Sequence, residues 1–169
     1  MKRLICVLIL PGLLCCERAA GAASVFPITQ FGATADDATL DTAAIQQAID
    51  ACAAAGGGTV RIPKGRFLSG GLRLKENIRL LFDKDAVLQG SDNCRDYGGE
   101  PKWTDALLKG ENLRNLRIKG SGRINSGLKA VLRARDGNVI TRERVTCQPA
   151  NANPYSVERV NAIDAKPAK

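Results

Sequence analysis

The chain has 169 residues, with 25 Lys and Arg against 17 Asp and Glu, and its formal net charge is +8. A basic chain suits an acidic partner, but aromatic residues make up only 4% of it, which argues against stacking on nucleic-acid bases. Three of the six cysteines fall within the first 16 residues, and the remaining three allow at most one bridge. The chain is therefore not a disulfide scaffold.

Residues 1–22 predict a secretory signal peptide. Lys2 and Arg3 precede an apolar run over residues 4–16, and small residues follow at 20–22. The run is too short to cross a bilayer as a stable helix, and it lacks the small residue expected before a lipidated cysteine. We therefore expect a secreted or periplasmic protein, monomeric and free of the membrane once the signal peptide is removed. The remainder is long enough for one domain.

A helix is predicted to start at Asp41-Thr42, because either side chain can accept a hydrogen bond from the amides of the first turn. The apolar residues that follow have helical spacing and form one stripe: Ile45, Ala48, Ile49 and Cys52. The triple glycine at 56–58 then ends the helix. Cys52 is expected to be a buried thiol within this stripe.

Beyond the glycines the apolar period changes to two, which predicts short strands at 60–62, 67–68, 72–75, 78–80, 87–88 and 116–119. Glycine- and proline-rich turns separate them too often for a sandwich, and this rhythm favours a solenoid. A weak internal repeat supports stacked coils, since KENIR at 75–79 recurs as GENLR at 110–114. From residue 127 the pattern changes to a helical run over 128–135, which would cap the last coil. A Pro-, Asn- and Ala-rich tail that we expect to be poorly ordered follows Cys147.

Several motifs in residues 31–91 occur together. They are Phe31-Gly32-Ala33, the pattern DTxAIQxAID at 41–50, the glycine run and Pro63-x-Gly65. In these motifs the chain resembles the amino-terminal part of polygalacturonases, pectin-degrading glycoside hydrolases of the pectate-lyase-like superfamily. The resemblance continues more weakly to Ile124-Asn125. It implies an all-β fold, a right-handed parallel β-helix with an amino-terminal capping α-helix. The expected organisation is a signal peptide at 1–22, a β-helix domain of about two to three coils at 23–126, and an atypical tail at 127–169.

The family's catalytic motifs are Asn-x-Asp, Asp-Asp, Gly-His-Gly and Arg-x-Lys. This chain has no histidine and no Asn-x-Asp, and its Arg-x-Lys at 117–119 lies too early in the chain. Inverting hydrolysis needs two carboxyls about 6.5–9.5 Å apart across the sugar. The four aspartates before and within the helix suit turns and caps better: Asp36, Asp37, Asp41 and Asp50. We therefore predict no catalytic residue, and whether this chain is an enzyme stays open.

Three functions are compatible with the resemblance. The first is a truncated polygalacturonase-like hydrolase without its catalytic coils. The second is a secreted, non-catalytic β-helix module that binds acidic polysaccharide such as pectin. The third is a lyase or epimerase on the same scaffold, because the opening segment is shared among these classes. No cofactor and no metal site is predicted.

Basic side chains alternate with apolar ones along the predicted strands. If the apolar residues point inward, seven basic residues point outward: Arg73, Lys75, Arg79, Arg114, Arg117, Lys119 and Arg123. Such a basic sheet face would attract a polyanion, and polygalacturonate is the first choice by resemblance. The candidate substrate-binding residues are Arg73, Arg79 and Arg114. A solvated face without a ligand is the competing interpretation.

The cysteines and the tryptophan are further candidate functional groups. Cys94 and Cys147 are the better candidates for the one possible bridge. Trp103, the only tryptophan, would either stack on a sugar ring or pack into the structure, and packing is the more frequent role of a lone tryptophan.

Overall fold

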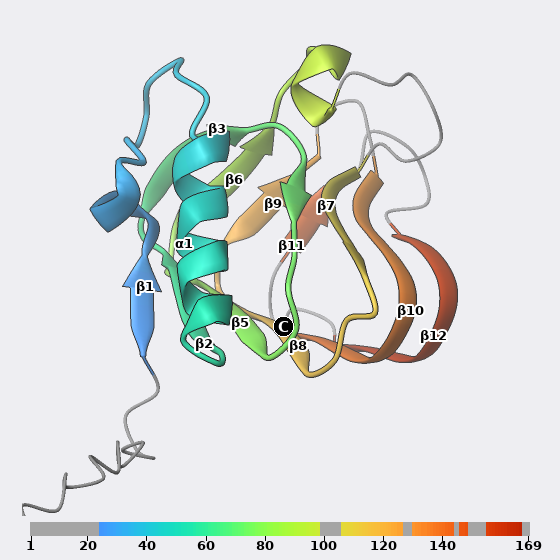
Figure 1. Cartoon of the computed structure of the whole chain (residues 1–169). Helices are drawn as coiled ribbons and strands as arrows, with labels where there is room; N and C mark the ends of the chain where they lie inside the picture. Colours follow the sequence, from blue (N-terminus) through green and yellow to red (C-terminus); the bar gives the residue numbers. More distant parts are fainter. Residues whose placement is uncertain (1–23, 99–105, 127–129, 144–145, 149–154, 167–169) are drawn as a thin grey trace, which may run out of the picture.

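The computed structural model describes residues 24–98, 106–126, 130–143, 146–148 and 155–166. Figure 1 shows a helix at one end of a stack of short strands. In chain order the elements are β1 (Val25–Pro27), η1 (Ile28–Phe31), α1 (Thr42–Ala54), β2 (Gly58–Ile62), β3 (Gly65–Ser69), β4 (Leu72–Arg73), β5 (Ile78–Phe82), β6 (Ala86–Gly90), η2 (Cys94–Tyr97), β7 (Ala106–Glu111), β8 (Leu116–Gly120), β9 (Arg123–Asn125), β10 (Ala130–Glu143), β11 (Thr146–Gln148) and β12 (Tyr155–Lys166).

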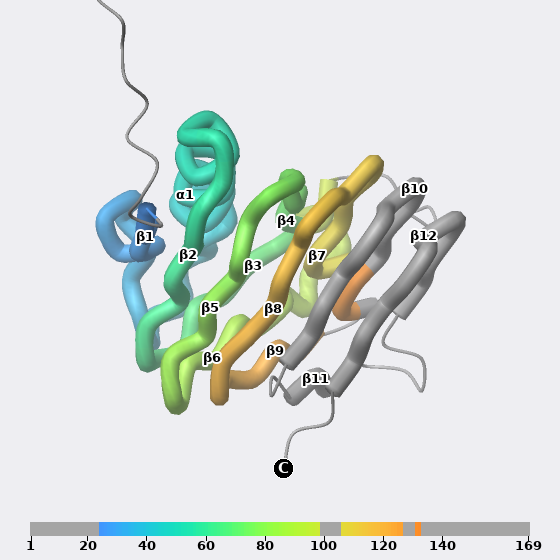
Figure 2. The backbone as a smooth tube through the Cα atoms, turned by 90° about the horizontal axis from the view of Figure 1, so that it is seen from below, coloured from blue at the N-terminus to red at the C-terminus, as the bar shows by residue number. Residues whose placement is uncertain are grey.

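The strands form a right-handed parallel β-helix, which confirms the predicted fold class. All the strand pairs are parallel, and each strand pairs with the equivalent strand one coil later. The chain visits three faces in turn. We call these the first face (β2, β5, β8 and the end of β10), the second face (β3, β6, β9 and β11) and the third face (β4, β7 and the start of β10). Figure 2 shows the first face from below, with its strands side by side.

The interior consists of apolar columns that run from coil to coil. On the first face Val60 lies beside Leu80 and Leu80 beside Ile118, and all three are at most 2% exposed. On the second face Phe67, Leu88 and Ile124 form an equivalent column with no exposed surface. Each of the six predicted strand segments therefore overlaps an observed strand, and side chains alternate as expected: Phe67 and Leu88 point inward, whereas their neighbours Leu68 and Val87 are only partly buried.

Helix α1 covers the amino-terminal end of this interior (Figure 1). Its buried residues are Ala44, Ile45, Ala48, Ile49 and Cys52, which confirms the predicted apolar stripe. The helix contacts β1, β2, β4 and β5. The helix is followed by Gly56, Gly57 and Gly58, whose φ angles are 87°, 117° and 150°. Residues other than glycine rarely adopt such positive φ angles. Within the described residues, no helix has the length and apolarity of a membrane span.

The strand register corrects the predicted internal repeat. Arg79 lies beside Arg117, so that Asn77 is equivalent to Asn115 rather than to Asn112. Asn77 and Asn115 share a left-handed conformation, with φ angles of 60° and 51°. The true repeat is thus Asn-Ile-Arg-Leu at 77–80 and Asn-Leu-Arg-Ile at 115–118. The register offset is 36 residues from Leu72 to Leu108 and 38 from Arg79 to Arg117, so the corner after β7 is two residues longer than the corner after β4.

The structure also corrects the prediction for the residues after 126. Of the segment expected to be helical, residues 130–135 lie in β10, which pairs with β7 at its start and with β8 at its end. Residues 155–166 of the tail form β12, which is parallel to β10, and the low order expected for the tail stays a prediction. Backbone hydrogen bonding to a preformed strand overrides the weak local preference of these residues. The coil therefore continues across the boundary expected at residue 127.

The capping role of α1 can be tested with Ile49→Ala. Ile49 is fully buried, so its truncation should lower the free energy of unfolding by about 2–5 kcal/mol through lost burial and a cavity. Chemical denaturation of the purified chain measures this loss. Gln47→Ala, on the exposed side of the same helix, is the control and should change stability by less than about 0.5 kcal/mol. Equal effects of the two substitutions would contradict the packing described here.

Candidate functional site

Asp36 and Asp37 fix the loop before the helix. Asp36 has a φ angle of 64°, and its Oδ1 accepts a hydrogen bond of 2.9 Å from the backbone N–H of Arg66. The Asp36 N–H donates in turn to the carbonyl oxygen of Arg66 at 2.8 Å. Oδ1 of Asp37 accepts from the N–H of Thr39 at 3.0 Å, a local turn contact. Both carboxylates therefore have structural partners.

Asp41 occupies the position before the helix, as predicted, but its side chain does not bond the first helical turn. Its Oδ1 instead accepts a hydrogen bond of 2.8 Å from the N–H of Thr34, seven residues earlier. The hydroxyl oxygen of Thr42 accepts from the N–H of Gly70 at 2.8 Å. The predicted side-chain cap is thus wrong, because both side chains tie the start of the helix to more distant backbone groups. Burial, assisted by Asp37, raises the pKa of Asp41 despite its bond to Thr34.

Asp50 lies on the exposed face of α1, where its Oδ1 accepts a hydrogen bond of 3.1 Å from Nε2 of Gln46. Gln46 also binds both backbone groups of Arg73. Its Oε1 accepts from the Arg73 N–H at 2.8 Å, and its Nε2 donates to the Arg73 carbonyl oxygen at 3.0 Å. All four aspartates therefore have structural hydrogen-bond partners, although the partner of Asp41 is not the one that the sequence indicated.

The seven basic residues are outward, as predicted, but they do not share one face. Arg73 lies on the third face, Arg79, Arg117 and Lys119 on the first, Arg123 on the second, and Lys75 and Arg114 at the corner between the third and first faces. The three candidate residues Arg73, Arg79 and Arg114 are therefore spread over two faces and a corner. A single basic sheet face is the wrong description, because the chain turns sharply between β4 and β5.

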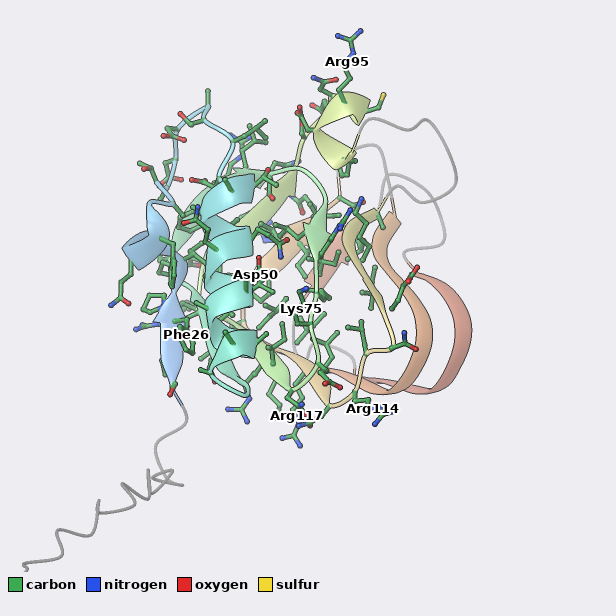
Figure 3. All side chains as sticks on the ribbon, viewed as in Figure 1. Phe26, Asp50, Lys75, Arg95, Arg114 and Arg117 are labelled. Atoms are coloured by element: carbon green, nitrogen blue, oxygen red, sulfur yellow. The ribbon has the colours of Figure 1, made fainter. Side chains whose placement is uncertain are left out.

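A hollow of about 400 Å³ lies at this corner. It is lined by Leu74, Lys75, Glu76, Glu111, Asn112 and Arg114. Leu74 is only 4% exposed and closes its base, whereas the charged residues around it are exposed. Figure 3 shows Arg114 and Arg117 projecting outward at the bottom of the molecule, away from Arg95 at the top. Its two cations, Lys75 and Arg114, are matched by two carboxylates, Glu76 and Glu111, so the hollow has no excess of positive charge for an acidic sugar.

Arg117 is a residue whose position sequence reasoning missed. The strand register places it directly beside Arg79 on the first face. The signal that could have found it is the repeated Asn-(Ile/Leu)-Arg at 77–79 and 115–117, which the stronger GENLR match concealed. By contrast Lys109, the neighbour of Arg73 on the third face, has a partner, because its Nζ donates to the Tyr97 carbonyl oxygen at 2.6 Å.

The cysteines differ in their environments. Cys52 is fully buried, as predicted, and burial raises the pKa of its thiol. Cys94 is a free, exposed thiol in η2, so the expected bridge to Cys147 is absent from this structure. The Cys147 side chain and Trp103 lie outside the described residues. Among the residues that are described, no group of three or more Cys, Asp or Glu has the arrangement of a metal site.

The structure is a parallel β-helix that is closed by an amino-terminal helix and carries its charged groups on the outside. Known proteins share this architecture. Residues 25–154 match the family described as "Rhamnogalacturonase A/epimerase, pectate lyase-like". The chain belongs to this family. The match extends well past residue 127, so the expectation that the family likeness ends there is wrong, in agreement with the continued coil of β10.

Individual proteins and solved structures are similar to this chain, and the structures agree with it in fold. The chain is 37% identical over 135 residues to an exo-poly-α-D-galacturonosidase of Dickeya chrysanthemi, an alignment that covers 69% of this chain and 22% of that protein. Among solved structures, a family 28 exopolygalacturonase of Yersinia enterocolitica superposes with a TM-score of 0.68 at 22% identity, over 85% of this chain and 41% of that one. A putative glycosyl hydrolase of Parabacteroides merdae gives a TM-score of 0.70 at 19% identity, covering 84% and 83%. The chain spans less than a third of the length of the galacturonan-degrading curated relatives.

The buried Asp41 carboxylate gives a test based on pH. Because its pKa is raised in the folded state, its favourable contribution is complete below its ordinary pKa of 3.8 and is lost as the pH rises through the higher folded value. Asp41→Asn keeps an oxygen for the Thr34 N–H but cannot ionise. Relative to the wild type, the variant should therefore become more stable as the pH rises from about 3.5 to 7.

Urea denaturation at a series of pH values measures this difference for both proteins. Gln47→Ala, a change on the exposed side of the helix that removes no ionisable group, is the control and should follow the wild-type pH dependence. Parallel curves for wild type and Asp41→Asn would show that Asp41 is not desolvated in the fold.

Proposed function

We propose that this protein is a polygalacturonase-like member of its family that binds acidic polysaccharide of the pectin type, and that it acts outside the cytoplasm. The outward basic residues of successive coils carry this proposal, since carboxylate groups of a uronate polymer pair favourably with Arg and Lys. The signal-peptide pattern at 1–22 supports the location. The name of the Dickeya relative, an exo-poly-α-D-galacturonosidase, supports galacturonate as the sugar.

We further propose that this chain by itself binds but does not hydrolyse the polymer. Each of the four aspartates around α1 is engaged by a backbone or side-chain donor. The chain also lacks histidine and the Asn-x-Asp motif. A hydrolytic site needs a free carboxyl pair aimed at the same glycosidic bond, and these aspartates are committed to loops and the helix surface. The same observations favour the second candidate function, a secreted β-helix module without catalytic activity.

Release of reducing ends from polygalacturonate separates binding from hydrolysis. The purified chain should release none above a blank, while a commercial polygalacturonase added to the same substrate provides the positive control. Measurable release that rises with protein concentration would contradict the non-catalytic proposal and leave the family assignment intact.

Retention on immobilised polygalacturonate tests the binding proposal. The chain should be retained at low salt and eluted as salt rises, because exposed ion pairs are screened. The combined variant Arg73→Glu, Arg79→Glu, Arg114→Glu should lose retention. A matched variant, Arg66→Glu, Arg95→Glu, Arg123→Glu, has the same net charge on other surfaces and should be retained more strongly. No retention of the wild type at low salt would refute the proposed binding.

A further inference from the structure

The in-register stacking of the coils places two guanidinium groups next to each other on the first face. Arg79 of β5 and Arg117 of β8 are paired neighbours in adjacent parallel strands, which are spaced about 4.8 Å apart. Their inward neighbours, Ile78, Leu80, Leu116 and Ile118, are buried, so both arginine side chains are on the solvent side of the same sheet. Adjacent like charges across strands are destabilising.

No described acidic residue compensates this pair. Neither guanidinium has a hydrogen bond or ion pair with the described residues, and the Arg79 Nε is buried without an acceptor. Arg61, on the preceding strand of the same face, provides the contrast. Its guanidinium forms an ion pair of 2.8 Å with Asp83, with both carboxylate oxygens within hydrogen-bonding distance. On the first face Arg61 thus has a counter-charge, whereas the adjacent Arg79 and Arg117 have none among the described residues.

We propose that Arg79 and Arg117 together form a binding site for uronate carboxylates of an acidic polysaccharide that runs across the strands, parallel to the axis of the solenoid. Two guanidinium groups on consecutive coils offer forked donors to the planar carboxylate, and an anion between them relieves their mutual repulsion. The identity of the ligand rests on the proposed function. The direction of the polymer follows from the register, because the two arginines succeed one another along the axis.

The proposed site contains only one of the three arginines that the sequence indicated as substrate-binding residues. Arg73 lies on the third face and Arg114 at the corner, so neither can join Arg79 on a straight path along the first face. Arg117 takes their place as the second member of the site. The polymer would then contact residues from two successive coils, which a single strand cannot supply.

The test measures the affinity of the full chain for defined polygalacturonate oligomers by calorimetry at low salt. Arg79→Gln and Arg117→Gln should each weaken binding by about tenfold, the loss expected for a hydrogen-bonded charge pair. Arg123→Gln removes the same charge from an exposed position on the second face and should weaken binding less than about twofold. Arg117 is exposed, so Arg117→Gln carries the test if Arg79→Gln fails to fold.

Thermal unfolding without ligand gives an independent readout. Arg117→Gln should raise the unfolding temperature, because it removes the repulsion from Arg79, whereas Arg123→Gln should leave it unchanged. A sulfated galactan and a fully methyl-esterified pectin serve as comparison ligands. Binding should be strongest for the free carboxylates and absent for the ester, and a preference for the sulfated galactan would overturn the uronate assignment.

The outcomes distinguish this inference from the proposed function. If Arg123→Gln weakens binding as much as Arg117→Gln, only net charge matters and the paired site is refuted while binding stands. If Arg73→Gln and Arg114→Gln weaken binding but Arg79→Gln and Arg117→Gln do not, the site lies at the corner instead. If the wild type binds no polygalacturonate oligomer, both the site and the proposed function fail.

Discussion

The structure depends on the in-register stacking of one coil on the next. Parallel hydrogen bonding aligns each backbone with its predecessor, and the same alignment places Val60, Leu80 and Ile118 in one interior column. The strand register therefore fixes both the backbone hydrogen bonds and the packing of the core. A slip of one residue would turn every inward side chain to the solvent, which makes the register costly to change. The same constraint brings charged side chains from residues far apart in sequence into contact outside the coil.

In the amino-terminal segment, side chains as well as backbone groups support the stacking on the first coil. Asp36 and Arg66 exchange hydrogen bonds in the manner of paired strands, and the N–H of Asp41 donates to the Leu68 carbonyl oxygen at 2.8 Å. These contacts hold the backbone of the segment, whereas the buried Asp41 carboxylate has a separate partner. The desolvation of this group is offset in part by its bond to Thr34.

Much of the fold was predictable from local pattern, and the exceptions have a common cause. The stripe of α1 and the alternation at Val60, Leu80 and Ile118 are local signals, and each placed its element correctly. The helical prediction for 128–135 failed because a short apolar spacing is ambiguous, and pairing with β7, more than twenty residues earlier, decided it. The cap prediction at Asp41 failed because its partner is a distant backbone N–H. The adjacency of Arg79 and Arg117 also depends on the length of an intervening coil, and the short Asn-(Ile/Leu)-Arg repeat that marks it is weaker than the GENLR match.

The double hydrogen bond from Gln46 to Arg73 has a consequence for association between molecules. β4 lies at the edge of the larger sheet, and the Gln46 amide occupies its backbone groups much as a neighbouring strand would. β1 occupies the edge of β2, and the Leu40–Leu68 bridge occupies that of β3. Among the described residues, each strand of the first coil is therefore covered at least in part on its amino-terminal side, and only the three-residue β1 is left as the last strand of the larger sheet. Such short or covered edges disfavour the edge-to-edge growth that leads to fibres.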